Sequence, residues 1–298
     1  MELEPTLHNP PTSHSMAEFK DDFQVGPETI TLFDKYLGIT DASQLRNHIL
    51  AISEKLKTSE KTYRCLREYK FVAPRLAPRF YYQHILEDRK RREQNGETPI
   101  FMDIGCCFGT DIRQIILDGY PAESIVGVDL YAHFIRLGYE LFQDVSKLQV
   151  KFISGNIFDE KFLSTSHEQP SSGSSNLNDY KHNVTYLNAG SVLHLFGNEQ
   201  IREFIRRAAL LLKPGGLFCG AHVGGNQSGT YERLFDGSIK YFEGKDSLKT
   251  ILEENDFTDV DIRATKRLNE PDFKDDKAKR DGFEALWLNF SAVYSPKV

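Results

Sequence analysis

The sequence is poor in cysteine and has no pattern that would link or ligate the few it contains. Only four cysteines occur in 298 residues, two of them adjacent and none in a Cys-x-x-Cys pair. This pattern predicts neither a disulfide framework nor a zinc site, and we expect no bound metal. A reducing, cytoplasmic compartment fits such a composition best.

The sequence also lacks a dense basic stripe and a long apolar run. The formal net charge is −6, and the nearest approach to a basic patch is the run from Asp88 to Glu93, which we interpret as a solvated helix end. We therefore expect no nucleic-acid substrate, because phosphate binding needs clustered cations. The first residues carry acids where a signal peptide carries cations, and no run is long enough for a membrane span, so we expect no membrane partner.

One stretch combines an apolar run, two glycines and a helix start. Residues 99–104 are mostly apolar, Gly105 and Gly109 follow, and Asp111 to Leu117 has a helical pattern. The order predicts a strand, a tight loop and a helix N-terminus. This arrangement suits a nucleotide-like ligand, because glycine allows close backbone approach and the helix N-terminus offers unpaired N–H groups.

The glycine spacing separates two kinds of nucleotide site. A dinucleotide fingerprint starting at Gly105 needs glycines at positions 107 and 110, where the chain has Cys107 and Thr110. The alternative pattern, acidic-x-Gly-x-Gly-x-Gly, matches at Asp103, Gly105 and Gly109 and fails only at Cys107. The second pattern is therefore favoured.

Three further landmarks follow in order. Residues 124–130 form an apolar strand that ends at Asp129, 20 residues after Gly109, where a carboxylate can accept both hydroxyls of a ribose. Residues 150–159 alternate and then turn at Asn156, and residues 210–220 predict a helix end, a proline–glycine reversal and a strand. The other predicted helices are 28–37, 41–57, 62–69, a segment through 88, 131–142, 198–212 and 246–255; the other strands are 183–191, 217–221, 260–263 and 285–294, with polar loops at 165–178 and 222–230.

Asp103 to Gly109 resembles motif I of the class I S-adenosylmethionine-dependent methyltransferases. Residues 103–113, 134–142 and 194–196 resemble the corresponding segments of a fungal branch of this class. That branch serves polyketide and meroterpenoid pathways. The resemblance implies an α/β fold: a Rossmann-like seven-stranded sheet whose last strand is antiparallel, helices on both faces, and an N-terminal helical lid. It divides the chain into a disordered arm (1–24), the helical lid (25–98) and a catalytic domain that binds S-adenosylmethionine (99–298).

The resemblance also implies which residues bind S-adenosylmethionine. Asp103 would lie beside its methionine end, Asp129 on the ribose, and Asn156, where an aspartate is more usual, on the adenine, because an amide both donates and accepts. The cofactor-binding residues that we expect are Asp103, Gly105, Cys107, Gly109, Asp129, Leu130, Asn156, Ile157 and Asn188.

The predicted lid ends in a segment rich in aromatic and arginine residues, from Phe71 to Tyr82. That mixture suits an apolar substrate carrying an acid, and the substrate candidates are Arg75, Arg79, Tyr81 and Tyr82. In the alternative interpretation, the aromatic residues pack the lid against the core and the arginines are solvated or cap carbonyls.

The resemblance implies a small-molecule O-methyltransferase acting on a carboxylate or phenol. A carboxylate needs no base, whereas a phenol does, and His194 and His222 are the candidates because each follows a predicted core strand. Either histidine can instead be structural. Cyclisation or isomerisation without methyl transfer, and methylation of carbon, nitrogen or a protein side chain, remain alternative functions, and the enzyme is a possible homodimer.

Overall fold

A computed structural model describes residues 22–57, 63–166, 175–232, 237–266 and 276–297. Within these ranges the chain has the predicted mixed α/β fold, with a seven-stranded sheet and a separate two-stranded sheet. Most of the predicted arm and the middle of the predicted loop at 165–178 lie outside them. The described end of the arm is packed, because Phe23 stacks on Tyr69 at 4.2 Å between ring centroids.

The chain divides into two compact units that differ from the predicted domains. Residues 99–105 and 156–298 belong to the first unit, and residues 13–98 and 106–155 to the second. The helices before residue 99 share a packing unit with residues 106–155, and the predicted division into arm, lid and catalytic domain stays a prediction.

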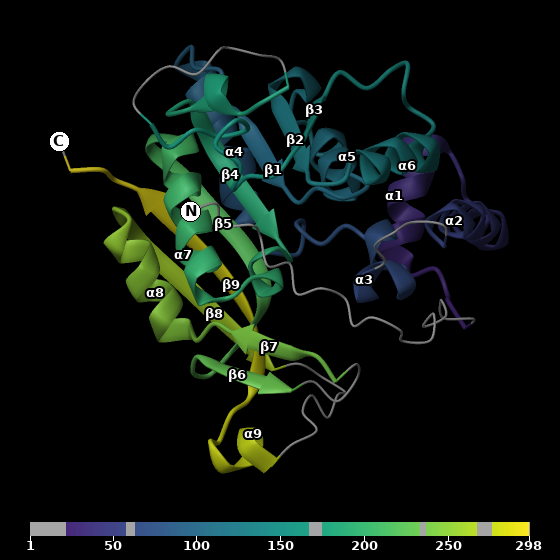
Figure 1. The fold of residues 1–298 in the computed structure, drawn as a ribbon. Coiled ribbons are helices and arrows are strands. Elements are labelled where there is room, and N and C mark those ends of the chain that lie inside the picture. The colour runs from purple at the N-terminus through teal and green to yellow at the C-terminus, as the bar shows by residue number, and fades with distance from the viewer. Residues whose placement is uncertain (1–21, 58–62, 167–174, 233–236, 267–275, 298) are drawn as a thin grey trace. The chain divides into compact units, whose positions relative to one another are not determined.

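The first unit contains five strands of the large sheet, together with α7 (Asn198–Leu211) and α8 (Lys245–Glu254), which pack on them (Figure 1). Strands β1, β4 and β5 are parallel neighbours, and β9 runs antiparallel to both β5 and β8. The predicted antiparallel last strand is confirmed. In spatial order the strands are β1 (Phe101–Ile104), β4 (Val184–Gly190), β5 (Leu212–Gly225), β9 (Ala285–Tyr294) and β8 (Phe257–Lys266).

The sequence underestimates β5 and misses a hairpin. Strand β5 runs through the reversal predicted at residues 213–216 and into the loop predicted at 222–230, because β9 pairs with it from Leu217 to Gly225. The rest of that predicted loop contains β6 (Gly229–Glu232), which pairs antiparallel with β7 (Ile239–Phe242). The unit also includes α9 (Asp276–Arg280) and the short 3-10 helices Asn178–Tyr180 and Leu193–Leu195.

The second unit contains the parallel pair of strands β2 and β3 and most of the helices. Asp41 caps the second helix, its carboxylate accepting the Gln44 amide at 2.6 Å. The elements are α1 (Pro27–Leu37), α2 (Ala42–Leu56), α3 (Arg64–Arg67), α4 (Tyr82–Gln94), α5 (Thr110–Leu117), β2 (Ile125–Asp129), α6 (Ala132–Phe142) and β3 (Lys151–Ser154), with 3-10 helices at Lys70–Val72 and Ala122–Ser124.

A continuous apolar cluster joins the N-terminal helices of this unit to α6 and the glycine loop. Phe33 of α1 stacks on Phe142 of α6 at 4.9 Å between centroids, and Phe71 stacks on Phe108 of the loop at 4.4 Å. These rings are buried. Because the same cluster holds α1, α2 and the loop, the N-terminal helices belong to the packing of the glycine loop.

Candidate functional site

In the first unit, two predicted cofactor residues meet at the ends of adjacent strands. The register of β1 with β4 places Asp103 opposite Asn188, and the Asn188 amide donates to Asp103 Oδ1 at 2.7 Å. Both side chains are buried. A buried carboxyl oxygen needs a hydrogen-bond donor, and Asn188 supplies one. The amide therefore holds the Asp103 side chain in place at the ends of the two strands.

Gly105 ends the same strand in a conformation and a space that exclude a side chain. Its φ is +79°, and a Cβ built on it would lie 2.4 Å from Cγ2 of Val192. Any other residue would be strained in the backbone and would collide with a buried neighbour. The residue that follows β1 therefore has to be glycine, without a side chain.

In the second unit, Asp129 is bonded directly to the glycine loop. Its Oδ2 accepts the Cys107 amide at 2.8 Å, and its Oδ1 accepts the Tyr131 amide at 2.9 Å. Burial raises the pKa of Asp129, and the two backbone donors oppose that rise. Each carboxylate oxygen can accept more than one hydrogen bond, so the group remains suited to a pair of ligand hydroxyls.

Cys107 has a glycine-like backbone at the position where the motif has glycine. Its φ is +55°, in the left-handed region, and Gly109 follows with a φ of +68°. A non-glycine residue at such a φ costs about 1–2 kcal/mol. The one mismatch in the sequence motif therefore changes the side chain and keeps the loop shape.

Three further predicted cofactor residues differ in exposure. Leu130, directly after β2, is 38% exposed, which is unusual for a leucine that follows a buried strand. In the first unit Asn156 closes a local turn, its Oδ1 accepting the Phe158 amide at 3.0 Å, and Ile157 is buried with its carbonyl bonded to Arg207. Leu130 therefore offers an apolar surface, whereas the side-chain oxygen of Asn156 has a structural partner.

Asp111, which the sequence analysis did not single out, binds the end of the predicted lid. Its Oδ1 accepts the amides of Arg75 and Leu76 at 2.6 and 2.8 Å, and the neighbouring Thr110 hydroxyl donates to the Phe71 carbonyl. Burial raises the pKa of Asp111, and these amides oppose the rise. The segment that begins at Phe71 is thereby attached to α5, the helix that follows the glycine loop. A carboxylate at the start of a helix, 36 residues from its partner, gives no signal of this in sequence.

The four substrate candidates from Phe71 to Tyr82 have structural partners. Arg79 Nε donates to the Arg75 carbonyl at 2.9 Å, and burial lowers the pKa of Arg79. Tyr81 and Tyr82 are buried, and the Tyr82 hydroxyl donates to Asp118 just beyond the other end of α5. The alternative interpretation, in which these aromatic residues pack the segment, fits the burial of both tyrosines, and a substrate contact for Tyr81 or Tyr82 stays a prediction.

The two histidine candidates have different environments in the first unit. His194 is half-buried in the 3-10 helix after β4. His222 lies inside β5 opposite Leu288, not in a loop beyond the strand as predicted, and it is fully buried with no hydrogen-bond partner at either ring nitrogen among the described residues. Burial lowers the pKa of His222 to about 4. Such a histidine is neutral at physiological pH and a weak base.

The cysteines do not combine with other ligating groups in the described part of the chain. All four are free thiols, and burial raises the pKa of Cys219 well above its ordinary value. Among the residues that the structure describes, no group of three His, Cys, Asp or Glu side chains is arranged to hold a metal ion. Over the same residues, no helix is both long enough and apolar enough to cross a membrane.

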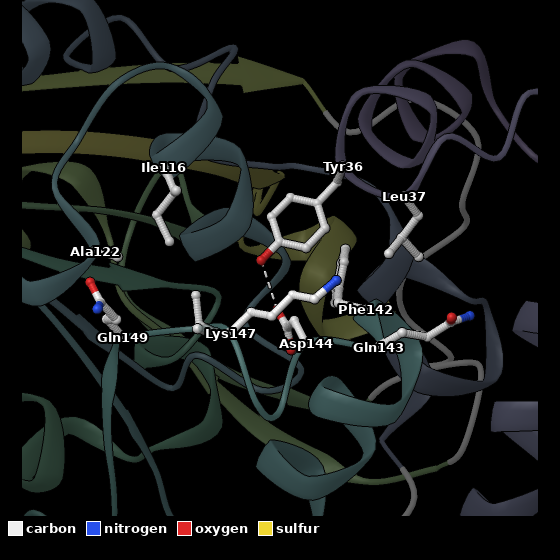
Figure 2. Close-up of a pocket in the computed structure, with 10 residues that line it drawn as sticks. Tyr36, Leu37, Ile116, Ala122, Phe142, Gln143, Asp144, Lys147 and Gln149 are labelled. Carbon is white, nitrogen blue, oxygen red and sulfur yellow. Dashed lines mark hydrogen bonds between the residues drawn. The ribbon is translucent and has the colours of Figure 1, made fainter.

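A pocket of about 230 Å³ in the second unit contains none of the predicted site residues. Figure 2 shows the Tyr36 hydroxyl pointing at Asp144, with the hydrogen bond of 2.7 Å between them. Asp144 also binds Arg113, which is almost completely buried. Arg113 ends the segment 103–113 that resembles the methyltransferase motif, but no periodic pattern in the sequence connects it to Asp144.

Comparison with known proteins finds relatives of one kind. The chain is 32% identical over 202 residues to the O-methyltransferase atr3 of Stereocaulon alpinum, which covers 67% of this chain and 53% of that protein. It is 31% identical to the O-methyltransferase phiE of a fungal species (52% and 48% covered) and 29% identical to the asnovolin E/chermesin D methyltransferase nvfJ of Aspergillus novofumigatus (72% and 70% covered). The chain thus spans about half the length of the first two relatives. No family model matches the chain.

Solved structures resemble the fold at low identity. A Haemonchus contortus phosphoethanolamine N-methyltransferase in complex with S-adenosyl-L-methionine aligns with a TM-score of 0.45 and 15% identity, covering 66% of this chain and 49% of that one. The [4+2]-cyclase SpnF aligns with a TM-score of 0.46 and 13% identity, covering 67% and 76%.

The sequence motif, the α/β fold and the curated relatives agree on one class of protein. The chain is similar in sequence to O-methyltransferases of fungi, and its glycine motif and α/β fold fit a class I S-adenosylmethionine-dependent methyltransferase.

Proposed function

We propose that this protein is a small-molecule O-methyltransferase that methylates a carboxylate or phenol of a polyketide- or meroterpenoid-type acceptor. The observation that carries the proposal is the bond between Asp129 and the amide of Cys107, which fixes a carboxylate on the glycine loop. Relatives described as O-methyltransferases support the reaction type. One relative is described as acting on asnovolin E and chermesin D, which supports a small organic acceptor.

The residues of the loop fit S-adenosylmethionine as the cofactor. Gly105, Cys107 and Gly109 each have a left-handed backbone, the conformation that a tight glycine loop at a nucleotide-like ligand requires. Asp129 would accept the ribose hydroxyls, the exposed Leu130 would cover a face of the adenine, and Asp103, oriented by Asn188, would attract the methionine ammonium. Asn156 and Ile157 remain the proposed adenine-edge contacts.

Methyl transfer requires mainly that the protein position the two reactants. The sulfonium of the bound cofactor supplies an activated methyl group, so an acceptor oxygen held in line and shielded from water is sufficient. A carboxylate acceptor is already ionised at neutral pH. A phenol has to lose a proton, and His222 is poorly matched to that task because burial lowers its pKa to about 4. A carboxylic acid is therefore the preferred acceptor, and His194 is the candidate base if the acceptor is a phenol.

The acceptor pocket is proposed to include the segment from Phe71 to Tyr82. Its attachment to Asp111 would tie acceptor binding to the helix that starts at the glycine loop. Arg75 remains the proposed partner for an acceptor carboxylate, with Arg79 and Tyr81 beside it. The cytoplasmic location and the homodimer expected from the sequence remain predictions.

A mass-spectrometric assay tests the proposal. Purified protein is incubated with S-adenosylmethionine and a panel of aromatic and terpenoid acids and phenols, and S-adenosylhomocysteine and acceptor products are followed together. We expect S-adenosylhomocysteine and an acceptor product heavier by one methylene to form in equal amounts. Acids should be methylated in preference to phenols. An acceptor that is isomerised with no gain in mass would replace the proposal by a cyclase, and methylation of carbon, nitrogen or protein alone would correct the acceptor atom.

A matched pair of variants makes that assay specific. Asp129→Asn removes the charge on the glycine loop, whereas Asp34→Asn makes the same change on the exposed surface of α1. We expect Asp129→Asn to lose most of the turnover and Asp34→Asn to retain it. Equal turnover in both variants would contradict the role of Asp129.

A further inference from the structure

Arg113 lies one helical turn after the glycine loop and bonds back to it. Its Nη1 donates to the carbonyl of Phe108 at 2.8 Å and to the carbonyl of Gly109 at 3.2 Å. The side chain is 1% exposed. These are charge-assisted bonds to backbone oxygens away from water, so they restrain the loop more strongly than neutral bonds at a surface would.

Asp144 orients the Arg113 guanidinium from the opposite side. Arg113 Nε donates to Asp144 Oδ2 at 2.9 Å and Nη2 donates to Oδ1 at 3.0 Å, which is a two-pronged ion pair between buried groups. The ring of Phe142 lies 4.7 Å from the guanidinium carbon. A planar guanidinium held by two parallel bonds cannot rotate freely, so Nη1 is aimed at the loop carbonyls.

Tyr36 extends this arrangement to the first helix. Its hydroxyl donates to Asp144 Oδ2, and its ring borders the pocket in Figure 2. Burial and the neighbouring carboxylate raise the pKa of Tyr36, so the hydroxyl keeps its proton and remains a donor. A chain of polar contacts thus runs from α1 through Asp144 and Arg113 to the glycine loop.

The loop needs such support because Cys107 has a left-handed backbone, which is unfavourable for a residue with a side chain. The Cys107 amide is held by Asp129. Asp129 fixes the amide at Cys107, and Arg113 fixes the carbonyls at Phe108 and Gly109. The loop is therefore anchored by one carboxylate at the Cys107 amide and by one guanidinium at the Phe108 and Gly109 carbonyls.

We propose that Arg113 is a positioning residue for cofactor binding, held in place by Asp144 and Tyr36. It contacts no reacting atom; it holds the Phe108 and Gly109 peptides in the shape that accepts the cofactor. The proposal rests on the proposed function for its ligand, S-adenosylmethionine, but its effect on the loop is independent of any ligand.

Removing Arg113 alone does not test this, because the unpaired Asp144 would destabilise the whole unit. The informative variant is the double change Arg113→Met with Asp144→Leu, which replaces the buried ion pair by apolar side chains of similar volume. Such replacements of buried pairs are often neutral for stability. The double variant keeps the fold but lacks the bonds to the loop carbonyls.

Three measurements on the full chain separate positioning from general stability. Calorimetry gives the affinity for S-adenosylmethionine, hydrogen exchange without ligand follows the amides from Cys106 to Thr110, and thermal unfolding reports the fold. We expect the double variant to unfold close to the wild type, to bind the cofactor about tenfold more weakly, and to exchange these amides faster. With acceptor present, the KM for S-adenosylmethionine should rise while kcat at saturating cofactor is retained.

Tyr36→Phe is the graded variant, since it removes one hydroxyl beside a pocket. It should weaken cofactor binding about two- to fivefold, because the Arg113 pair stays intact. A double variant that unfolds like the wild type, binds the cofactor equally well and exchanges its loop amides at the same rate would overturn the proposal. If the wild type does not bind S-adenosylmethionine, the proposed function fails, and the exchange rates alone still decide whether Arg113 fixes the loop.

Discussion

Two buried basic side chains, one in each unit, differ in their hydrogen-bond partners. In the second unit Arg113 is bonded through each of its three nitrogens, to Asp144 and to the loop carbonyls. In the first unit His222 is equally buried, yet neither ring nitrogen has a partner among the described residues. The comparison shows two ways in which a buried basic side chain is accommodated. Arg113 has a hydrogen-bond partner for each nitrogen, whereas His222 avoids the penalty of a buried charge by staying neutral.

The largest effect is expected from Arg113→Met as a single change. It leaves the Asp144 carboxylate buried without its partner, so the free energy of unfolding should fall by about 3–5 kcal/mol. Urea unfolding followed by circular dichroism measures this. The second change, Asp144→Leu, should restore most of the loss, and a single variant as stable as the wild type would show that the pair is not buried in solution.

His222 should make stability depend on pH. Its pKa is about 4 in the fold and 6.5 in its ordinary state, so the unfolded chain takes up the proton first as the pH falls. The neutral form of His222 makes its full contribution to the unfolding free energy above pH 6.5, and this contribution is lost as the pH falls towards 4. The total loss is about 3 kcal/mol.

Unfolding in urea at pH 7.5 and pH 4.5 tests this with His222→Leu as the comparison. The variant should lose less stability than the wild type between the two conditions, because it has no proton to take up at that position. Identical losses would mean that His222 is solvated or partnered. Retained methyl transfer in this variant would also remove His222 from the candidates for a catalytic base.

A smaller loss of unfolding free energy is expected for a substitution at Gly109, which contacts Arg113 and has a left-handed backbone. A Cβ on Gly109 would lie 2.4 Å from Nη1 of Arg113, and its φ of +68° disfavours a side chain. Gly109→Ala should therefore lower the unfolding free energy by about 2 kcal/mol and displace the guanidinium. Chemical unfolding gives the magnitude, and a neutral result would show that Arg113 can move without cost.

The smallest effect is expected at Cys107, where two contributions of opposite sign nearly cancel. Its φ of +55° is already unfavourable for a side chain, so Cys107→Gly removes strain while adding flexibility to the unfolded chain. The net change in unfolding free energy should be within about 1 kcal/mol of zero and cofactor affinity should be retained. A loss as large as that at Gly109 would show that the thiol itself is needed.

The parts of the fold that could be predicted are those coded by local pattern. Strands β2 and β9 were predicted within a residue or two because each is a compact run of apolar or β-branched residues. The hairpin of β6 and β7 was missed because its strands have four residues each and lie among polar and glycine residues. Strand β5 was predicted too short, since pairing with β9 extends it beyond its apolar centre.

The candidate site was predictable where a motif fixes the spacing and unpredictable where the fold supplies the partner. Asp103 and Asn188 were both expected, and parallel pairing of β1 with β4 brings them into contact. The partner of Arg113 is 31 residues away on a different element, and no periodicity indicates it. His222 was predicted in a loop because glycine and polar residues follow it, and such residues usually indicate that a strand has ended.

The measurement that tests the central claim most directly is calorimetric titration of S-adenosylmethionine into the wild type, Asp129→Asn and Asp34→Asn. The wild type and the surface control should bind one cofactor with equal affinity, and Asp129→Asn should bind at least about tenfold more weakly, because charge-assisted bonds to the ribose are lost. No binding by the wild type, or equal binding by all three proteins, would contradict a methyltransferase site built on the glycine loop and Asp129.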